Sequence, residues 1–393
     1  MGLPKIKIGE NEITWFNTVD SGFASMLEAI DSACRTIDLE MYIFRNDAVG
    51  HDFRTALLDA QARGVKIRVM LDGLGSVTLA SDYWNELVKG GGEFRLFNPV
   101  RITGPIFRDH RKLLAVDGKI AFIGGFNIGE EYRGDGIEHG WHDCGCRLDG
   151  PGVGVLVGAF EQMWQRSEHK RQFLPRLRKG SADHRAMGER LSLLLTGPGR
   201  APFVMQETLL ADIRKAKTIN IISAYFLPPR KLLRGLMRAA RAGVKVRLLL
   251  AGKTDVQVAM LAAHRLYHPL LKAGVEIYEY EPQILHTKCY LIDQTAYIGS
   301  ANMDIRSLRI NYELLVRCED QSLAGTMLQF FEQALNHSKL ISLADWKSHR
   351  NFWTKMKEEW AWLILARLDP WLSQAQVSAS RPPRNQNRRT TVR

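Results

Sequence analysis

Two short segments of the chain combine side chains that could act on a phosphate ester. His110 and Lys112 flank a single residue in the first segment, and His286 and Lys288 do the same 176 positions later. A histidine can serve as a nucleophile or a proton carrier, and a lysine ammonium can bind phosphate. One such pair is a weak signal, because both residue types are common on protein surfaces. Two pairs of the same form indicate one kind of chemistry encoded twice.

The sequence after the first histidine predicts a β-hairpin. Strands at Leu113–Val116 and Ile120–Ile123 are separated by a turn at Asp117. Because the second strand runs back beside the first, Asn127 should lie near His110. Residues two apart on a strand share a face, so the imidazole and the ammonium should point the same way.

The second copy repeats this hairpin with Asn302 and adds the hydroxyl of Ser300, where the first copy has Gly125. Two lysines, two amides, the N–H groups of the glycine loops and this hydroxyl would form a cradle of donors for a phosphate. No cluster of Asp and Glu with metal-ligand spacing accompanies them. We therefore expect no metal and no cofactor, since the ammonium groups can supply the positive charge.

The histidine segments belong to a longer internal repeat. Four blocks recur in the same order at offsets of 176–183 residues: Glu40–Phe44 as Ser223–Leu227, Arg63–Val69 as Ala242–Leu248, Lys89–Pro99 as Lys272–Pro282, and His110–Lys112 as His286–Lys288. Each copy alternates helical and apolar strand patterns, with helices expected at 24–34 and 53–63 and strands at 36–44 and 65–71. This alternation indicates an α/β fold with helices on the faces of each sheet. We expect lobes at residues 1–180 and 181–345 and a C-terminal segment at 346–393, with Arg166–Gly188 joining the copies.

Composition narrows the partners of the protein. The 393 residues include 54 Lys and Arg against 42 Asp and Glu, a net charge of +12, which favours anionic partners such as nucleic acid or a phospholipid bilayer. Five cysteines without a paired framework indicate a reducing compartment. Cys144 and Cys146 could bind a metal, but small core side chains on a strand are the favoured interpretation. The N-terminus lacks an apolar signal core, and no apolar stretch is long enough to span a membrane. If the protein meets a membrane, we expect it to lie on the surface.

Together these residues resemble the signature of the phospholipase D superfamily, H-x-K-x4-D followed by G-[GS]-x-N. The first copy fits it as His110, Lys112, Asp117 and Gly124–Asn127, and the second as His286, Lys288, Asp293 and Gly299–Asn302. Over residues 10–370 the chain is similar to bacterial cardiolipin synthases of the shorter type, without N-terminal membrane helices. The resemblance implies two duplicated phospholipase D-like α/β/α lobes about a pseudo-twofold axis, with one active site between them.

The resemblance also implies a two-step mechanism. His110 would attack phosphorus to give a covalent phosphohistidine, and His286 would protonate the leaving alcohol and then activate the incoming one. The internal symmetry of the sequence does not decide this order. Gly125 stands where the superfamily more often has serine, which removes one hydroxyl donor on that side.

Four acidic residues are candidates for supporting roles. Asp117 and Asp293 fall at the far turns of their hairpins, so we expect them to be turn or salt-bridge residues. Asp143 and Glu313 are better placed to orient the imidazoles, since each precedes a strand at a similar distance after its histidine. The alternative is that both are ordinary strand-edge carboxylates. The acidic, glycine-rich stretch Glu130–Gly140 has no assigned role.

The C-terminal segment bears on the substrate. Asn351–Leu372 has a helical pattern, and its apolar and aromatic residues suit either the interface of a bilayer or packing on the core: Trp353, Trp360, Trp362, Trp371, Leu363, Ile364 and Leu365. The tail Arg381–Arg393 has five arginines and no acid. It could bind an anionic membrane or nucleic acid, or be disordered.

We therefore predict a phosphatidyltransferase of the cardiolipin synthase kind. It would transfer a phosphatidyl group between two phosphatidylglycerols and release glycerol, bound peripherally to the cytoplasmic face of a bacterial membrane. The alternatives are a phospholipase D that hydrolyses phospholipids and a nuclease of the same superfamily. A nucleic-acid partner is not expected, because no clear surface of interleaved aromatic and basic residues lies near the motifs. A non-catalytic scaffold is disfavoured because both motifs are intact.

Overall fold

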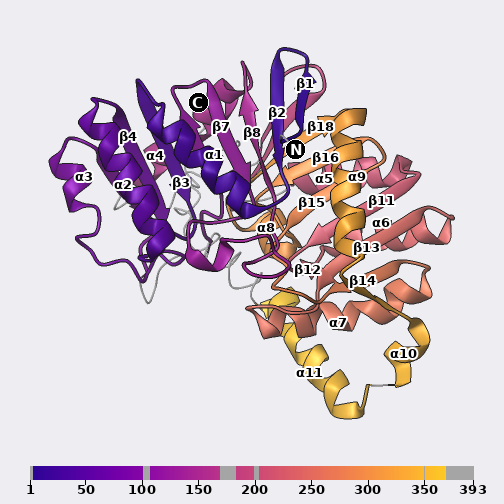
Figure 1. Ribbon diagram of the computed structural model, residues 1–393. Helices are drawn as coiled ribbons and strands as arrows, with labels where there is room; N and C mark the ends of the chain where they lie inside the picture. The colour runs from indigo at the N-terminus through magenta and orange to yellow at the C-terminus, as the bar shows by residue number, and fades with distance from the viewer. Residues whose placement is uncertain (1–2, 101–106, 169–182, 199–202, 349, 369–393) are drawn as a thin grey trace, which may run out of the picture.

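The computed structural model describes residues 3–100, 107–168, 183–198, 203–348 and 350–368. Two β-sheets, each with helices packed on both faces, form two lobes (Figure 1). The first lobe is the indigo and purple half of the molecule, and the second is the pink and orange half.

The first sheet has the strand order β1-β2-β8-β7-β6-β3-β4-β5. Its strands are β1 (Lys5–Ile8), β2 (Asn11–Phe16), β3 (Thr36–Met41), β4 (Lys66–Asp72), β5 (Glu93–Phe97), β6 (Leu113–Val116), β7 (Ile120–Gly124) and β8 (Gly145–Asp149). The helices of this lobe are α1 (Val19–Asp31), α2 (Ala48–Ala62), α3 (Asn85–Lys89), α4 (Val153–Glu168) and a 3-10 turn, η1 (Glu130–Tyr132).

The second sheet has the order β9-β10-β18-β16-β15-β11-β13-β14-β19. Its strands are β9 (Asp183–Ala186), β10 (Leu191–Thr196), β11 (Thr218–Ser223), β13 (Lys245–Ala251), β14 (Glu276–Tyr280), β15 (Lys288–Ile292), β16 (Thr295–Gly299), β18 (Glu313–Glu319) and β19 (Ser338–Ile341). The helices are α5 (Val204–Lys215), α6 (Arg230–Arg241), α7 (Gln257–Lys272), α8 (Ile305–Arg309), α9 (Gln321–Leu335), α10 (Leu343–Ser348), α11 (Phe352–Leu363) and the π-helix η2 (Ile364–Leu368). Two short strands, β12 (Phe226–Leu227) and β17 (Met303–Asp304), pair with each other.

The second sheet repeats the first strand by strand and adds β19 at one edge. In each sheet three neighbouring strands are parallel, β3-β4-β5 in the first and β11-β13-β14 in the second. The motif hairpins, β6–β7 and β15–β16, pair antiparallel beside them. The α/β fold with two duplicated lobes, predicted from the sequence repeat, is confirmed.

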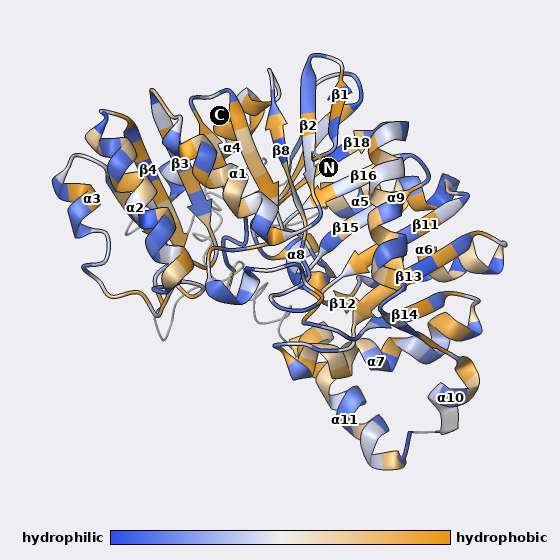
Figure 2. Ribbon diagram, in the orientation of Figure 1, coloured by the Kyte–Doolittle hydropathy of each residue, from blue (hydrophilic) through white to orange (hydrophobic). Residues whose placement is uncertain are grey.

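The helices cover the sheets in corresponding ways. Helices α1 and α2 pack on one face of the first sheet and α4 on the other, while α5, α6 and α7 lie on one face of the second and α9 on the other. One buried core crosses between the lobes, where the ring of Trp15 on β2 meets that of Phe330 on α9 edge-on at 5.6 Å. Figure 2 shows strands that are largely apolar between helices with alternating polar and apolar stripes. The lobes therefore share a hydrophobic core.

The hairpin turns have the form that their sequence predicts. Asp117 and Asp293 both adopt positive φ angles, 54° and 51°, which short polar side chains tolerate. The Asp117 carboxylate accepts hydrogen bonds from the N–H groups of Cys34, Arg35 and Thr36 at 2.7–3.0 Å. The Asp293 carboxylate accepts from the N–H groups of residues 217 and 218. Both aspartates thus fasten a hairpin turn to the start of a central strand, at the end of the hairpin opposite the histidine motif.

Some helix boundaries differ from those expected. The helix expected at 53–63 begins at Ala48, because the Asp47 carboxylate caps it by accepting from the N–H of Gly50 at 2.9 Å. The expected strand at 36–44 ends at Met41. Cys144 and Cys146 are buried at the start of β8, as a strand interpretation requires. Of the joining stretch Arg166–Gly188, the first residues end α4 and residues 183–186 form β9, while 169–182 lie outside the described residues.

The C-terminal helix presents two different faces. Trp362 and Leu365 pack against the core of the second lobe, as expected for a helix that docks on α7. The other face leaves apolar side chains exposed: Phe352, Trp353, Met356, Trp360, Leu363, Ile364 and Leu368. The core-packing alternative is therefore confirmed for one side of the helix, while the other side is apolar and exposed. Trp371 and the tail Arg381–Arg393 lie outside the described residues, and within the described part of the chain no helix has the length and hydropathy needed to cross a bilayer.

Candidate active site

Backbone pairing between the lobes brings the two histidine motifs together. The N–H of His110, just before β6, donates to the carbonyl oxygen of Tyr312 in the second lobe at 2.9 Å. The N–H of His286, just before β15, donates to the carbonyl oxygen of His142 in the first lobe at 2.8 Å. The first motif is thus anchored to the segment that leads into β18 of the second lobe. The second motif is anchored to the segment that leads into β8 of the first lobe.

The residue that follows each of these anchoring residues is an acid, and its carboxyl group contacts the imidazole of the other lobe. Nδ1 of His110 lies 3.0 Å from Glu313 Oε2, and Nδ1 of His286 lies 2.6 Å from Asp143 Oδ2. Both carboxylates are fully buried. When Nδ1 carries the proton and donates to the carboxylate, the other ring nitrogen, Nε2, holds a free lone pair for chemistry. The acids proposed from sequence are in contact with the imidazoles, and each belongs to the opposite lobe.

A buried lysine accompanies each histidine. Lys112 Nζ donates to the carbonyl oxygen of His110 at 2.6 Å, and Lys288 Nζ lies 2.8 Å from Nδ1 of His286 and also contacts the His286 carbonyl. Burial lowers the pKa of Lys112 to about 7 and also lowers the pKa of Lys288. An anion bound between the lysines would favour their charged ammonium forms, and the two ammonium groups would in turn stabilise the bound anion.

Burial also perturbs the other titratable groups of the site. It lowers the pKa of His110 well below its usual value and, with the neighbouring Lys288, lowers the pKa of His286 to about 4. Burial raises the pKa of Glu313 to about 8. Both imidazoles are therefore neutral near pH 7 before an anion binds. A phosphodiester would add negative charge and raise the pKa of either histidine again.

The two loop asparagines differ in their contacts. Asn127 uses both ends of its amide: Oδ1 accepts from the N–H of Ile43 at 3.0 Å, and Nδ2 donates to the Tyr132 hydroxyl at 2.7 Å. These bonds hold the segment just after β3 and the turn η1, so Asn127 has a positioning role. Its role as a phosphate donor stays a prediction, since Nδ2 carries a second hydrogen. Asn302 is also buried, and its Oδ1 has no hydrogen-bond partner among the described residues.

Ser300 and Gly125 take different roles from those expected. The Ser300 hydroxyl donates to Glu313 Oε2 at 2.5 Å and accepts from the N–H of Leu314 at 3.1 Å, so it holds the carboxylate and is not directed at a phosphate. At the equivalent position, a Cβ added to Gly125 would lie 2.7 Å from Asp143 Oδ2 and closer still to Oδ1. Because Gly125 has no side chain, it leaves room for the carboxylate of Asp143, which is shorter than Glu313, to reach His286.

Aromatic side chains flank both imidazoles. The Tyr42 ring lies 4.7 Å from the His110 ring, while Tyr132 and Trp141 lie 5.2 Å and 5.3 Å from the His286 ring. The sequence repeat pointed to Tyr42 but not to the other two. The available signal was loop length: residues 128–142 comprise 15 residues between Asn127 and the acid, and residues 303–312 comprise only 10.

Three side chains of metal-ligand type lie close together in the loop that contains Tyr132 and Trp141. Among the described residues, Asp135, Glu138 and His139 have ligand-type atoms within 4.8 Å of one another, on the protein surface. Asp135 Oδ1 already accepts the N–H groups of Ile137 and Glu138, both at 2.9 Å, which shape the turn. The cluster therefore has a structural explanation in the loop itself.

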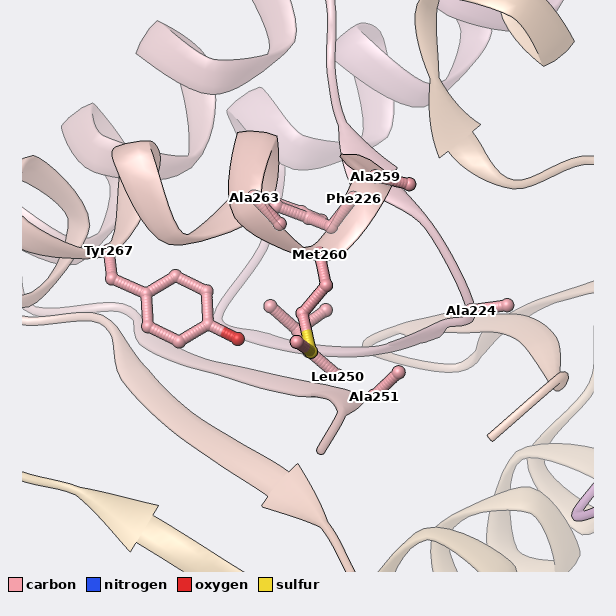
Figure 3. A pocket seen from close by; sticks show the side chains of 8 residues that line it. All are labelled: Ala224, Phe226, Leu250, Ala251, Ala259, Met260, Ala263 and Tyr267. Atoms are coloured by element: carbon pink, nitrogen blue, oxygen red, sulfur yellow. The ribbon is translucent and has the colours of Figure 1, made fainter. Parts of the chain in front are cut away.

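An apolar hollow opens close to the motifs in the second lobe (Figure 3). It is small, with about 10 Å³ open to the centre of a water-sized molecule, or room for about one water, and it lies between α7 and the ends of neighbouring strands. Its lining residues are Ala224, Phe226, Leu250, Ala251, Ala259, Met260, Ala263 and Tyr267. The N–H of Ala224 donates to the carbonyl oxygen of Thr287, which separates His286 from Lys288, so the hollow begins next to the motif.

The duplicated lobes and the paired H-x-K motifs define a protein with the phospholipase D-like fold. A family model described as "Cardiolipin synthase, PLD-like domain" matches residues 26–138 and 209–335, one segment in each lobe. The chain belongs to this family.

Curated relatives agree with that assignment, and a solved structure has the same fold. The chain is 33% identical over 340 residues to cardiolipin synthase 1 of Bacillus cereus, covering 82% of this chain and 66% of that protein. It is 36% identical over 299 residues to the cardiolipin synthase of a Geobacillus species, covering 74% and 60%. It thus spans slightly less than two thirds of the length of these relatives. The crystal structure of phosphatidylserine synthase from Haemophilus influenzae has the same fold, with a TM-score of 0.71 at 13% identity, covering 95% of this chain and 97% of that one.

Proposed function

We propose that the protein is a phosphatidyltransferase that forms cardiolipin from two molecules of phosphatidylglycerol and releases glycerol. The observation that carries this proposal is the exchange of carboxylates, which sets two oriented imidazoles, His110 and His286, beside two buried lysines at one interface. Such a site can bind one phosphodiester, attack it and protonate its leaving group. Both named relatives are cardiolipin synthases.

In the first proposed step, Nε2 of His110 attacks phosphorus and a P–N bond forms as the bond to the glycerol oxygen breaks. Glu313 supports the attack by holding the imidazole through Nδ1. The leaving oxygen takes a proton from His286. The pKa of His286 is lowered to about 4 by burial, so we infer that the negative charge of the bound substrate raises it and populates the acid form.

In the second proposed step, the P–N bond breaks and a bond to the hydroxyl oxygen of a second phosphatidylglycerol forms. The hydroxyl proton passes to His286, which regains the form required for the next turnover. One phosphodiester is exchanged for another, so the reaction needs no nucleotide. The lysines stabilise the extra negative charge in both transition states.

Two features support a lipid substrate. The net charge of +12 suits an anionic surface such as a phospholipid bilayer. Helix α11 exposes a continuous apolar face in which Trp353 is 69% and Trp360 59% exposed. We propose that this face lies in the interfacial layer of the membrane, and that the protein is bound peripherally to the cytoplasmic side of a bacterial membrane.

Product analysis tests the proposal. The full chain is incubated with phosphatidylglycerol vesicles and single-stranded DNA together, in excess EDTA, and the products are identified by mass spectrometry. Cardiolipin is the expected product. Phosphatidic acid alone would assign a phospholipase, shortened DNA a nuclease, and a strict need for a divalent ion would contradict the proposed mechanism.

A further inference from the structure

Among the described residues, the loop over His286 has no counterpart of equal length over His110. It runs from Gly129 to Trp141 in the first lobe and begins with the turn η1. The corresponding segment of the second lobe is five residues shorter and forms β17 and α8 instead. The pseudo-symmetric site is therefore built asymmetrically around its two histidines.

This loop is fastened to the second lobe. The Tyr280 hydroxyl donates to the carbonyl oxygen of Gly136 at 2.6 Å, and the Gln283 side-chain amide donates to that of Glu138 at 2.8 Å. The loop also closes on itself, since the N–H of Trp141 donates to the Glu131 carbonyl oxygen at 3.0 Å. A first-lobe segment is thus fixed across the interface, beside a second-lobe histidine.

Two aromatic rings of this loop cover His286. Tyr132 is fully buried, and its ring packs against Trp141 at 4.7 Å and against the imidazole edge-on at 5.2 Å. Trp141 is partly exposed and lies 5.3 Å from the same imidazole. The imidazole side chain of His286 is 6% exposed, against 12% for that of His110. These two rings form an aromatic wall beside His286, in which Tyr132 is the buried part and Trp141 the partly exposed part.

We propose that Trp141 determines whether the phosphohistidine is resolved by an alcohol or by water. This inference rests on the proposed function, in which His286 removes the proton from the incoming hydroxyl. Either nucleophile breaks the P–N bond, forms a P–O bond and gives its proton to His286, so the products are a phosphodiester or phosphatidic acid. A lipid alcohol gains apolar contact with the indole, whereas water gains none. The wall thus favours transfer over hydrolysis.

Replacing the indole tests this role. Trp141→Ala should raise the ratio of phosphatidic acid to cardiolipin by roughly tenfold, the scale of discrimination that a small apolar contact provides. The matched control is Ile137→Ala, in the same loop but with an exposed side chain, which should leave the ratio unchanged. An equal loss of both products in Trp141→Ala would mean that the indole is only structural, and a shifted ratio in the control would assign the effect to the loop as a whole.

A second measurement does not depend on how well the alanine variant folds. In the wild-type protein, methanol, propanol and pentanol compete with water for the phosphohistidine, and the yield of each phosphatidyl alcohol is measured per mole of alcohol. Yield should rise with chain length, and Trp141→Phe should keep most of this rise while Trp141→Ser flattens it. A wild-type yield that is independent of chain length would overturn the inference. Absence of both transfer and hydrolysis in the wild type would instead refute the proposed function.

Discussion

A single methyl group at Gly125 should disable the second histidine. The added Cβ would lie 2.7 Å from Asp143 Oδ2 and closer to Oδ1, whereas Cβ atoms keep at least about 3.0 Å from other heavy atoms. The carboxylate would have to retreat by roughly half an ångström to one ångström. Its hydrogen bond to His286 Nδ1, now 2.6 Å, would then become too long to fix the ring.

The expected loss follows from this displacement. A misplacement of about 1 Å in an active site costs about 100-fold in rate, or about 2.7 kcal/mol of transition-state stabilisation. We expect Gly125→Ala to reduce kcat for cardiolipin formation by about that factor. Substituting serine, the residue more usual at this place in the superfamily, adds the same Cβ and should also be harmful.

Two matched variants isolate the cause. Gly154→Ala, on α4, adds a Cβ that meets no atom within 4 Å and should leave kcat unchanged. Ser300→Ala, at the position equivalent to Gly125, removes only the hydroxyl that donates to Glu313 and should cost about tenfold. Initial rates on phosphatidylglycerol vesicles, with thermal unfolding as a check on folding, give the comparison. A Gly125→Ala protein that keeps more than a third of the wild-type kcat would refute the argument.

Three further predictions have defined outcomes. Asp143→Asn and Glu313→Gln should each lower kcat by about 10²–10⁴-fold without unfolding the protein, because each removes the carboxyl group that holds one imidazole through Nδ1; losses below fivefold would contradict cross-lobe orientation. Burial lowers the pKa of Lys112 to about 7, and only the charged ammonium attracts phosphate, so kcat/KM should fall as pH rises through about 7. Because bound substrate favours the charged lysine, kcat should fall only at a higher pH. A kcat/KM profile that is flat up to about pH 9 would exclude this role of Lys112. Trp353→Ala with Trp360→Ala should weaken sedimentation with anionic vesicles while leaving thermal unfolding nearly unchanged, since both side chains are exposed; undiminished binding would remove α11 from the membrane contact.

The sequence repeat predicts the fold well because it is a strong and redundant signal. Both copies carry the same alternation of helices and strands, and both hairpins show a turn aspartate between apolar strands. Boundaries move where one side chain changes a helix end, as Asp47 does by capping α2. The repeat also identifies Asp143 and Glu313 as equivalent acids. It cannot assign each acid to a histidine, because the exchange between lobes follows from how the sheets meet.

Other features of the site depend on the direction in which a side chain points, which the residue type does not reveal. The sequence predicts that the Ser300 hydroxyl binds phosphate, but in the structure this hydroxyl donates its hydrogen bond to the Glu313 carboxyl group. The Asn127 amide accepts from the N–H of Ile43, just after β3, and donates to the Tyr132 hydroxyl, contacts that the residue type alone does not predict. Tyr132 and Trp141 occur in a loop of one copy only, so comparison of the copies gives no signal for them. The Trp-rich C-terminal helix divides into a packed face and an exposed face, a division that depends on its contact with α7.

The most direct test of the account is the cardiolipin-forming rate of two single variants, His110→Ala and His286→Ala. If the motifs are two halves of one site, each variant should fall by at least about 1,000-fold while unfolding like the wild type. A rate above a tenth of wild type in either variant would contradict the single shared site.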